Sequence, residues 1–222
     1  MFTGIVRGVA EVVDVGDHGG IRSLKIRCPQ GFCDEVQIGA SISVDGVCLT
    51  VVDAPGSDIV VFDVIRGSLE VTTLGTLVSG SCVNVERSAC QGDEIGGHVV
   101  SGHVDFQAEI LEVSRDEHNC KMCFHLPTSW SYYLFSKGYV AVNGVSLTVA
   151  DVDKDQGFFQ VWLIPETCRR TTFGEKRVGE RVNVEVERTT QILVDTIRRT
   201  LRESLGSLDL VDKVVAENKV PS

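Results

Sequence analysis

The sequence contains an internal repeat, and no other feature constrains the fold as strongly. The segment VDGVCLTV at residues 44–51 recurs as VNGVSLTV at residues 142–149, with six of eight positions identical at an offset of 98 residues. Further blocks keep this register, allowing one inserted residue before the last two: Thr3–Val6 with Ser101–Val104, Ala10–Glu11 with Ala108–Glu109, Thr73–Gly75 with Thr172–Gly174, and Val83–Glu86 with Val182–Glu185. A period near 98 residues is far longer than a solenoid unit, so each copy is predicted to be a domain.

Each copy has the pattern of short β-strands. Runs such as SLKIRC, VVFDVI and CVNVER alternate apolar and polar residues, and glycine, proline, asparagine and aspartate separate them at short intervals. Many short strands joined by turns indicate a barrel or a sandwich. Short helices are expected around residues 31–39 and 129–138, at matching positions in the two copies.

The segment after the second copy has a helical pattern instead. From residue 189 to 205 the apolar residues recur every four positions, at Leu193, Ile197, Leu201 and Leu205. Gly206 is a natural helix stop, and residues 207–222 are expected to form a frayed extension. The apolar stripe must be buried either on the chain's own barrels or on other subunits, and the pattern leaves both open.

Charge and cysteine content exclude several classes of function. A net charge of −10 and a pI of about 4.9 disfavour binding to nucleic acid or to anionic membranes. Neither a signal peptide nor an apolar run of membrane-spanning length is evident, so the cytoplasm is the expected compartment and the eight cysteines are expected to be reduced. Cys120 and Cys123 lack the second pair that a zinc ribbon needs, and are predicted to be small core residues on one strand face.

The repeated strand carries the first candidate chemistry. Alternation points Cys48 and Thr50 to one face and Leu49 and Val51 to the other, and the same pattern holds for Ser146 and Thr148 in the second copy. Small polar groups on one face suit a half-polar ligand pocket, although a single such strand could equally face water. The recurrence of the pattern in both copies favours a site.

The junction between the copies, DEIGGHVVSGHVD at residues 93–105, carries two histidines five residues apart. A metal site is disfavoured because no third ligand stands at a suitable spacing. The glycines instead permit close backbone approach to a planar ligand. His103 occupies the repeat position of Ile5, which suggests either proton transfer or a hydrogen bond across the domain interface.

Taken together, four motifs resemble the riboflavin synthase family: MFTGIV at the start, the tandem GVCLTV and NGVSLTV, DEIGGHxxxGHVD at the junction, and LIPETxxRTTFG. The resemblance spans about residues 1–205 in order and spacing. It implies an all-β fold of two tandem six-stranded Greek-key barrels with a C-terminal α-helix. The implied boundaries are 1–97 and 98–188 for two lumazine-binding barrels, 189–205 for an oligomerisation helix, and 206–222 for a flexible tail.

The resemblance also implies an activity. Members of the family convert two molecules of 6,7-dimethyl-8-ribityllumazine into riboflavin and a ribitylaminopyrimidine by transfer of a four-carbon unit, without a metal or cofactor. They assemble as homotrimers through their C-terminal helices, and association with lumazine synthase is a further partnership that the resemblance suggests. The duplication would give one chain two related pockets, with the reacting pair meeting between the first barrel of one subunit and the second barrel of another.

Site residues are carried over where the motifs match. The resemblance assigns catalytic roles to His103, Ser146, Thr148 and Cys48, with His103 and Ser146 handling protons, Thr148 orienting the ring and Cys48 in the opposite pocket. The substrate contacts expected in the first copy are Gly4, Ile5, Val6, Ser41, Cys48, Leu49, Thr50 and Asp63. Those expected in the second copy are Gly102, His103, Val104, Lys137, Ser146, Leu147, Thr148, Ile164, Pro165, Glu166 and Thr167.

The first copy departs from the family pattern in its turn and its ligand loop. Asp45 stands where the second copy has Asn143, and the loop reads Arg66-Gly67-Ser68-Leu69 where the second copy has the pair Glu166-Thr167. Glu187 stands where the family usually carries aspartate. These departures keep open a non-catalytic lumazine- or flavin-binding paralogue like the lumazine proteins of luminous bacteria. The enzyme is favoured by the retention of Phe2, Thr3, Cys48, His98, His103, Ser146 and Thr148.

Overall fold

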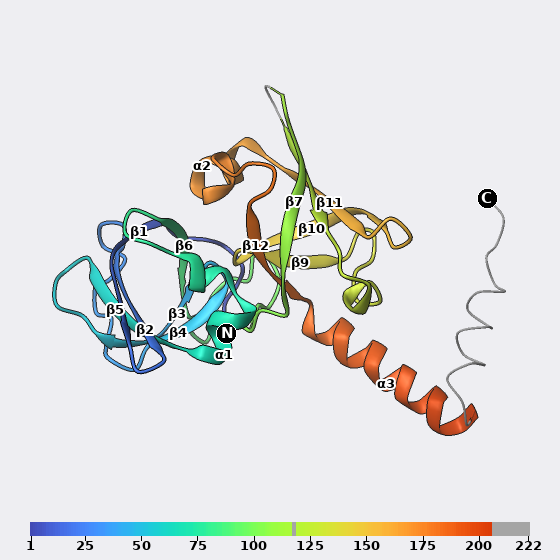
Figure 1. Ribbon diagram of the computed structural model, residues 1–222, viewed down its shortest axis with the longest axis horizontal. Helices are drawn as coiled ribbons and strands as arrows, with labels where there is room; N and C mark the ends of the chain where they lie inside the picture. The colour runs from blue at the N-terminus through green and yellow to red at the C-terminus, as the bar shows by residue number, and fades with distance from the viewer. Residues whose placement is uncertain (117–118, 206–222) are drawn as a thin grey trace. The chain divides into compact units, whose positions relative to one another are not determined.

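The computed structural model describes residues 1–116 and 119–205. The first copy folds into a closed antiparallel barrel with the strand order β1-β2-β5-β4-β3-β6 (Figure 1). Its strands are β1 (Gly8–His18), β2 (Ile21–Arg27), β3 (Ser41–Val44), β4 (Val47–Asp53), β5 (Ile59–Ile65) and β6 (Cys82–Arg87). Closure pairs every strand on both sides, which removes the exposed edges that an open sheet would leave.

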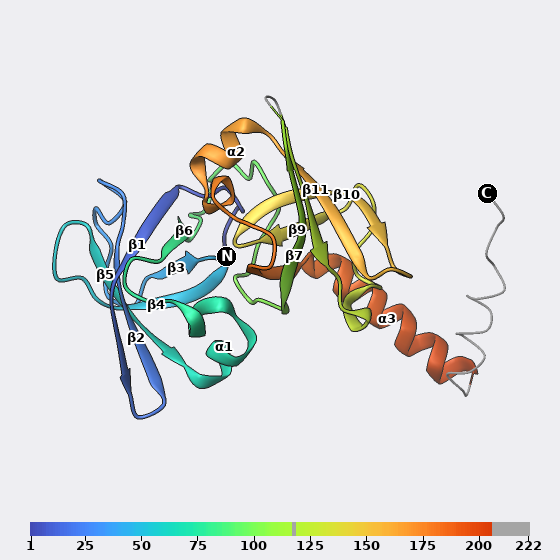
Figure 2. The same ribbon diagram turned by 45° about the horizontal axis from the view of Figure 1, so that its top comes forward.

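The second copy repeats this topology. Its barrel closes in the order β7-β8-β11-β10-β9-β12, and its curved strands can be followed in the second view (Figure 2). The strands are β7 (Phe106–Arg115), β8 (Cys120–His125), β9 (Tyr139–Val142), β10 (Val145–Asp153), β11 (Phe158–Leu163) and β12 (Arg181–Val186). The predicted fold class, two six-stranded barrels followed by a helix, is confirmed.

Irregularities of the strands are repeated as well. The β1–β2 register shifts between Val12 and Asp14, and the β7–β8 register shifts between Ile110 and Glu112, which is 98 residues further along. The β4–β5 and β10–β11 pairs have matching shifts at residues 51–53 and 149–151. Bulges of this kind add the bend that lets a short sheet close into a barrel. The duplication therefore preserved the bends of the strands along with their hydrophobic pattern.

The helices predicted inside the barrels are not formed as expected. Residues 31–39 are a succession of turns, because Gly31, Glu35 and Gly39 adopt left-handed backbone angles with φ of 78°, 59° and 90°, which interrupt a right-handed helix. In the second copy only the 3-10 turn η2 (Thr128–Trp130) is helical. Apolar residues in these segments gave the appearance of a helical face, but they pack on the barrel cores from irregular backbone.

A second correction concerns the C-x-x-C motif. Residues three apart on a strand point to opposite faces, so Cys120 and Cys123 do not share one. Cys120 joins the barrel core with Met122 and Phe124, whereas Cys123 lies on the outer face and is covered there. All eight cysteines are free thiols.

The two barrels meet through their repeated hairpins. Asp45-Gly46 and Asn143-Gly144 form two-residue turns with positive φ at both positions, as type I′ hairpins require. The turns pack backbone against backbone: a Cβ atom on Gly46 would lie 2.7 Å from the nitrogen of Gly144. Only glycine satisfies both the left-handed angle and this close approach.

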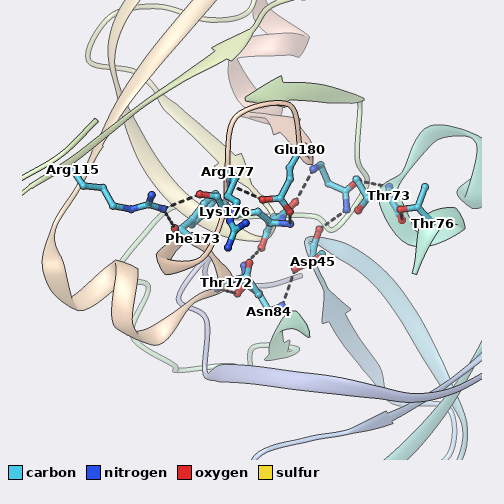
Figure 3. A network of polar contacts seen from close by, with 12 residues as sticks. Asp45, Thr73, Thr76, Asn84, Arg115, Thr172, Phe173, Lys176, Arg177 and Glu180 are labelled. Atoms are coloured by element: carbon cyan, nitrogen blue, oxygen red, sulfur yellow. Dashed lines mark hydrogen bonds and ion pairs between the residues drawn. The ribbon is translucent and has the colours of Figure 1, made fainter. Parts of the chain in front are cut away.

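Buried asparagine side chains form a symmetric set of hydrogen bonds across this contact between the barrels, which we call the seam (Figure 3). The Asn84 Nδ2 group donates to the Asn143 carbonyl at 3.0 Å, and the Asn183 Nδ2 group donates to the Asp45 carbonyl at 2.9 Å. The Oδ1 atoms of these asparagines accept the backbone N–H groups of the other barrel, from Thr172 to Asn84 and from Thr73 to Asn183, both at 2.8 Å. Each barrel thus provides hydrogen-bond partners for buried backbone groups of the other.

The C-terminal element is the helix α3 (Arg188–Leu205). Its apolar stripe is exposed, with Leu193, Ile197 and Leu201 at 59%, 50% and 38% relative accessibility. The predicted stop at Gly206 and the predicted extension of residues 207–222 lie outside the described residues. None of the helices described has the length and apolar character needed to span a membrane.

Candidate functional site

The polar faces of the repeated strands point outward from the barrels. Leu49 and Leu147 are buried in the cores, so a ligand on the outer face can reach only their backbone. Cys48 and Ser146 are half-buried, while Thr50 and Thr148 are exposed. The alternation predicted from the sequence is therefore confirmed. What covers these faces is decided by the other copy.

Each outward face is covered by a glycine loop from the opposite copy. The Ser146 N–H donates to the Gly4 carbonyl at 2.8 Å, and a Cβ atom on Gly4 would lie 2.5 Å from the Ser146 Cβ. The side chain of Val6 then packs on the core of the second barrel. Residues 4–6 of the first copy thus lie beside Ser146 of the second, and we call this place the Ser146 site.

The reciprocal contact forms the second place, which we call the Cys48 site. The Cys48 N–H donates to the Gly102 carbonyl at 2.8 Å, and a Cβ atom on Gly102 would lie 2.6 Å from the Cys48 Cβ. Val104 packs on the core of the first barrel. Phe2, at 1% exposure, lies beneath this contact and bridges to Val100 by two backbone hydrogen bonds.

This exchange corrects the grouping that the sequence suggested. His103 was paired with Ser146 in proton handling, but its loop lies against Cys48. The ring beside Ser146 belongs to His98, whose Nδ1 lies 2.7 Å from the Ser146 Oγ. His98 also stacks on Tyr139, with ring centroids 5.3 Å apart. The expected contacts omitted His98, although the junction motif contains it.

The His98 ring is 8% exposed, and its Nε2 has no hydrogen-bond partner among the described residues. Burial lowers the pKa of His98 below its ordinary value, and the nearby Glu187 carboxylate opposes this effect. A lowered pKa favours a neutral imidazole at neutral pH. Such a ring can accept a proton from the Ser146 hydroxyl and return it afterwards as the imidazolium.

The loops after β5 and β11 have the same backbone in both copies. Helix α1 (Arg66–Val71) precedes the turn η1 (Thr73–Thr76), and helix α2 (Pro165–Arg170) precedes η3 (Thr172–Gly174). The departure of the first copy is therefore one of side chains, with Gly67 in the place of Glu166. The Glu166 carboxylate is exposed and forms ion pairs with Arg169 and Arg170, which lower its pKa.

The remaining predicted contacts lie around these faces. Ser41 pairs with Thr50 across the β3–β4 hairpin and lines a cavity of about 490 Å³ in the first barrel. Asp63 is exposed on the outer face of β5. Lys137 has a left-handed backbone angle, φ 69°, and its N–H donates to the Val149 carbonyl at 2.8 Å. Ile164, Pro165 and Ile5 are exposed.

One aromatic side chain was missed by the sequence reasoning. Val149 pairs with Val161, so the adjacent outward positions Thr148 and Trp162 lie side by side across β10 and β11. Trp162 is 55% exposed, an unusual state for an indole. Its repeat position in the first copy is Asp63, which was predicted as a contact. That correspondence is the signal that could have found Trp162.

The comparisons with known proteins agree with this geometry. Residues 3–88 and 101–187 each match the family model of the lumazine binding domain. The chain is 42% identical over 202 residues to riboflavin synthase of Escherichia coli (strain K12), covering 90% of this chain and 93% of that protein. The chain belongs to the riboflavin synthase family. Riboflavin synthase of Chlamydia pneumoniae is 44% identical over 204 residues, covering 92% and 98%.

Solved structures extend the likeness to the fold. LumP in complex with 6,7-dimethyl-8-(1'-D-ribityl) lumazine superimposes with a TM-score of 0.76 at 25% identity, covering 84% of this chain and 99% of that one. LumP in complex with riboflavin gives a TM-score of 0.78 at 26% identity, covering 84% and 100%. Identity to the synthases is much higher than identity to LumP. Membership of this family therefore supports an enzyme, and the non-catalytic paralogue is not favoured.

Proposed function

We propose that the chain catalyses the dismutation of two 6,7-dimethyl-8-ribityllumazine molecules into riboflavin and 5-amino-6-ribitylaminouracil. The observation that carries this proposal is the His98–Ser146 pair on the outward face of β10, next to the exposed Thr148 and Trp162. A planar bicyclic ligand suits such a face, because an indole offers a stacking surface and the hydroxyls offer hydrogen bonds.

The reaction requires a proton to leave the C7 methyl group of one lumazine while the other is attacked at C7. In our proposal the Ser146 oxygen takes the proton of the C7 methyl group while its own hydroxyl proton passes over 2.7 Å to the neutral His98 ring, which becomes an imidazolium. Thr148 orients the ring from the same face. Transfer of four carbons between two ordered molecules depends on positioning, which offsets a large entropic cost.

The Cys48 site would hold the second lumazine. Its groups are the Cys48 thiol, the Thr50 hydroxyl and the His103 imidazole, which the swapped loop brings to this side. Gly67 offers no carboxylate for ribityl hydroxyls where α2 offers Glu166. We therefore expect the Ser146 site to bind the ribityl chain more tightly than the Cys48 site does.

The assembly is part of the same proposal. One chain carries each site once, and the two ligands must meet face to face, so we propose that the Ser146 site of one subunit faces the Cys48 site of another in a homotrimer. The exposed apolar stripe of α3 supports a role for this helix in assembly. Association with lumazine synthase would place the source of the substrate nearby, and the free cysteines suit the cytoplasm.

The activity is tested by incubating the purified chain with 6,7-dimethyl-8-ribityllumazine and following riboflavin absorbance in a single turnover. We expect conversion by the wild type and losses of about 10²-fold or more in Ser146→Ala and His98→Gln, with a smaller loss in Cys48→Ser. Ser114→Ala, at an exposed position of β7, is the matched control. A ligand that stays bound and unconverted would instead identify a lumazine-binding protein.

The assembly is tested by sedimentation of Leu193→Asp and of a chain ending at Glu187. We expect both to dissociate and to lose turnover while still binding one lumazine. An unchanged oligomer in both variants would exclude α3 as the assembly element.

A further inference from the structure

Two buried glutamates bind the two glycine loops in the same way. The Glu86 Oε1 atom accepts hydrogen bonds from the Thr3 N–H and the Thr3 hydroxyl, both at 2.7 Å, and its Oε2 accepts the Gly4 N–H at 3.1 Å. The Glu185 Oε1 accepts the Ser101 N–H at 2.7 Å and the Ser101 hydroxyl at 2.8 Å, and its Oε2 accepts the Gly102 N–H at 2.9 Å.

Burial makes these interactions strong and specific. Each glutamate is only 3% exposed, and a carboxylate removed from water is stabilised by the donors it can still reach. Burial raises the pKa of Glu86, and its three donors oppose that rise. The two hydroxyls also bind the next residue of each loop. The Thr3 Oγ1 accepts a hydrogen bond from the Ile5 N–H at 3.2 Å, and the Ser101 Oγ accepts one from the His103 N–H at 3.3 Å.

The loops held in this way serve the opposite barrel. Glu86 lies on β6 of the first barrel, yet the carbonyl of the loop that it holds receives the Ser146 N–H. Glu185 lies on β12 of the second barrel, and its loop receives the Cys48 N–H and carries His103. Both contacts are too close to admit a side chain on the loop, since a Cβ atom on Gly4 would lie 2.5 Å from the Ser146 Cβ and one on Gly102 would lie 2.6 Å from the Cys48 Cβ.

We propose that Glu86 and Glu185 are positioning residues that act crosswise, so that the glutamate of each barrel sets the geometry of the site on the other barrel. Glu86 places residues 3–6 against Ser146 and, through Ser146, fixes the His98 contact. Glu185 places residues 101–104 against Cys48 and fixes His103. The proposal deepens the proposed function and rests on it for its kinetic consequences, but its structural pattern can be measured independently.

The test exchanges each carboxylate for an amide. Glutamine keeps the shape, but offers one oxygen acceptor and turns an NH₂ group toward an N–H donor of the loop. The readouts are the ring resonances of His98 and His103, assigned with His98→Gln and His103→Gln, together with kcat and KM for dimethylribityllumazine. Glu109→Gln, an exposed glutamate on β7, is the matched control.

We expect Glu86→Gln to shift the His98 resonances and leave those of His103 in place, and Glu185→Gln to do the reverse. We expect kcat to fall about 10- to 100-fold in both, because displacements near 1 Å at a reacting centre cost this much. The conservative variants Glu86→Asp and Glu185→Asp should restore part of kcat. Where a glutamine variant fails to fold, Thr3→Val and Ser101→Ala remove the hydroxyl, with its bond to the carboxylate and the bond it accepts from the loop, and should give the same crosswise pattern at reduced size.

The proposal is overturned if each variant perturbs the histidine of the other loop, if both variants perturb both histidines equally, or if neither histidine responds. Variants that show the crosswise pattern, together with a wild type that makes no riboflavin, would refute the proposed function and leave the positioning role standing.

Discussion

Asp45 breaks the symmetry of the two hairpin tips at the inter-barrel seam, and replacing it with asparagine should stabilise the protein in a pH-dependent way. Asp45 is 4% exposed at the tip of the β3–β4 hairpin, where its Oδ1 accepts the Asn84 N–H at 2.8 Å. At the equivalent tip, the Asn143 Oδ1 accepts the Asn183 N–H at 2.7 Å. Asparagine therefore fits the Asp45 position with the same hydrogen bond and the same left-handed backbone.

The magnitude follows from the cost of ionising a buried carboxyl. Burial raises the pKa of Asp45 from 3.8 to about 7, opposed by the Asn84 N–H and by the Lys176 ammonium group, which is itself paired with Glu180. A tenfold change in a proton equilibrium is worth about 1.4 kcal/mol, so ionised Asp45 destabilises the folded state by up to about 4 kcal/mol.

The sign is set by the direction of this pKa change. Because the folded-state pKa is raised, the folded protein binds more protons than the unfolded chain between pH 3.8 and about 7, and wild-type stability falls as pH rises through that window. An asparagine side chain at this position cannot ionise. The advantage of Asp45→Asn should therefore be small near pH 4, grow by about 2 kcal/mol between pH 5.5 and 8, and level off above.

The assay is urea unfolding at a fixed protein concentration, with the free energy of unfolding compared across this pH range. Asn143→Asp is the matched variant, since it installs the same carboxyl in the symmetric position and should lose stability over the same window. The reasoning is refuted if the gain in Asp45→Asn does not change with pH, or if Asn143→Asp shows no corresponding loss.

Three further predictions follow from contacts in the seam and the sites. In urea unfolding, Gly46→Ala should lower the free energy of unfolding by about 3 kcal/mol or more, since its methyl group would lie 2.7 Å from the Gly144 backbone. The control Gly19→Ala also has a left-handed backbone, with φ of 60°, but faces open space, and should lower the free energy of unfolding by only about 1 kcal/mol. In stopped assays from pH 5 to 8, turnover should decrease toward acid with a midpoint below the ordinary histidine pKa, because burial lowers the pKa of His98. A midpoint above the ordinary histidine pKa would contradict a buried neutral base. Substrate should quench the fluorescence of Trp162, and Trp162→Phe should abolish most of the quenching while Trp130 still emits; equal quenching in both proteins would exclude Trp162 from the site.

Much of the fold was predictable because it depends on local patterns. The repeat predicted two copies of one barrel, the period-two alternation predicted strands, and the Asp-Gly and Asn-Gly dipeptides are typical of the hairpins that meet at the seam. The expected helices at 31–39 and 129–138 failed for a different reason. Apolar spacing there reflects packing on the barrel cores, and left-handed residues such as Glu35 cannot be recognised from spacing alone.

Most residues of the candidate site lie in motifs that the sequence shows, but their grouping does not follow from those motifs. Ser146, Cys48 and His103 were predicted as site residues from the strand and junction motifs, whereas His98 was left out of the predicted contacts. The pairing of His103 with Ser146 was wrong, because a repeat aligns each loop with its own copy and gives no sign that the loops are exchanged. Trp162 was overlooked for a related reason, since a lone tryptophan in a strand is ordinary until its cross-strand neighbour is known.

The sequence by itself determined that this chain forms two similar β-barrels, because the alternation of apolar and polar residues, the turn residues and the repeat can all be recognised within short segments of the chain. Only the tertiary structure decided which residues share a site. Gly4 reaches Ser146 and Gly102 reaches Cys48 because the barrels pack about a common seam, where the Gly46 and Gly144 turns meet and the buried amides of Asn84 and Asn183 cross over. The placement of each loop on the opposite barrel depends on contacts between residues about 60 to 140 positions apart in the sequence, and no local pattern predicts such contacts.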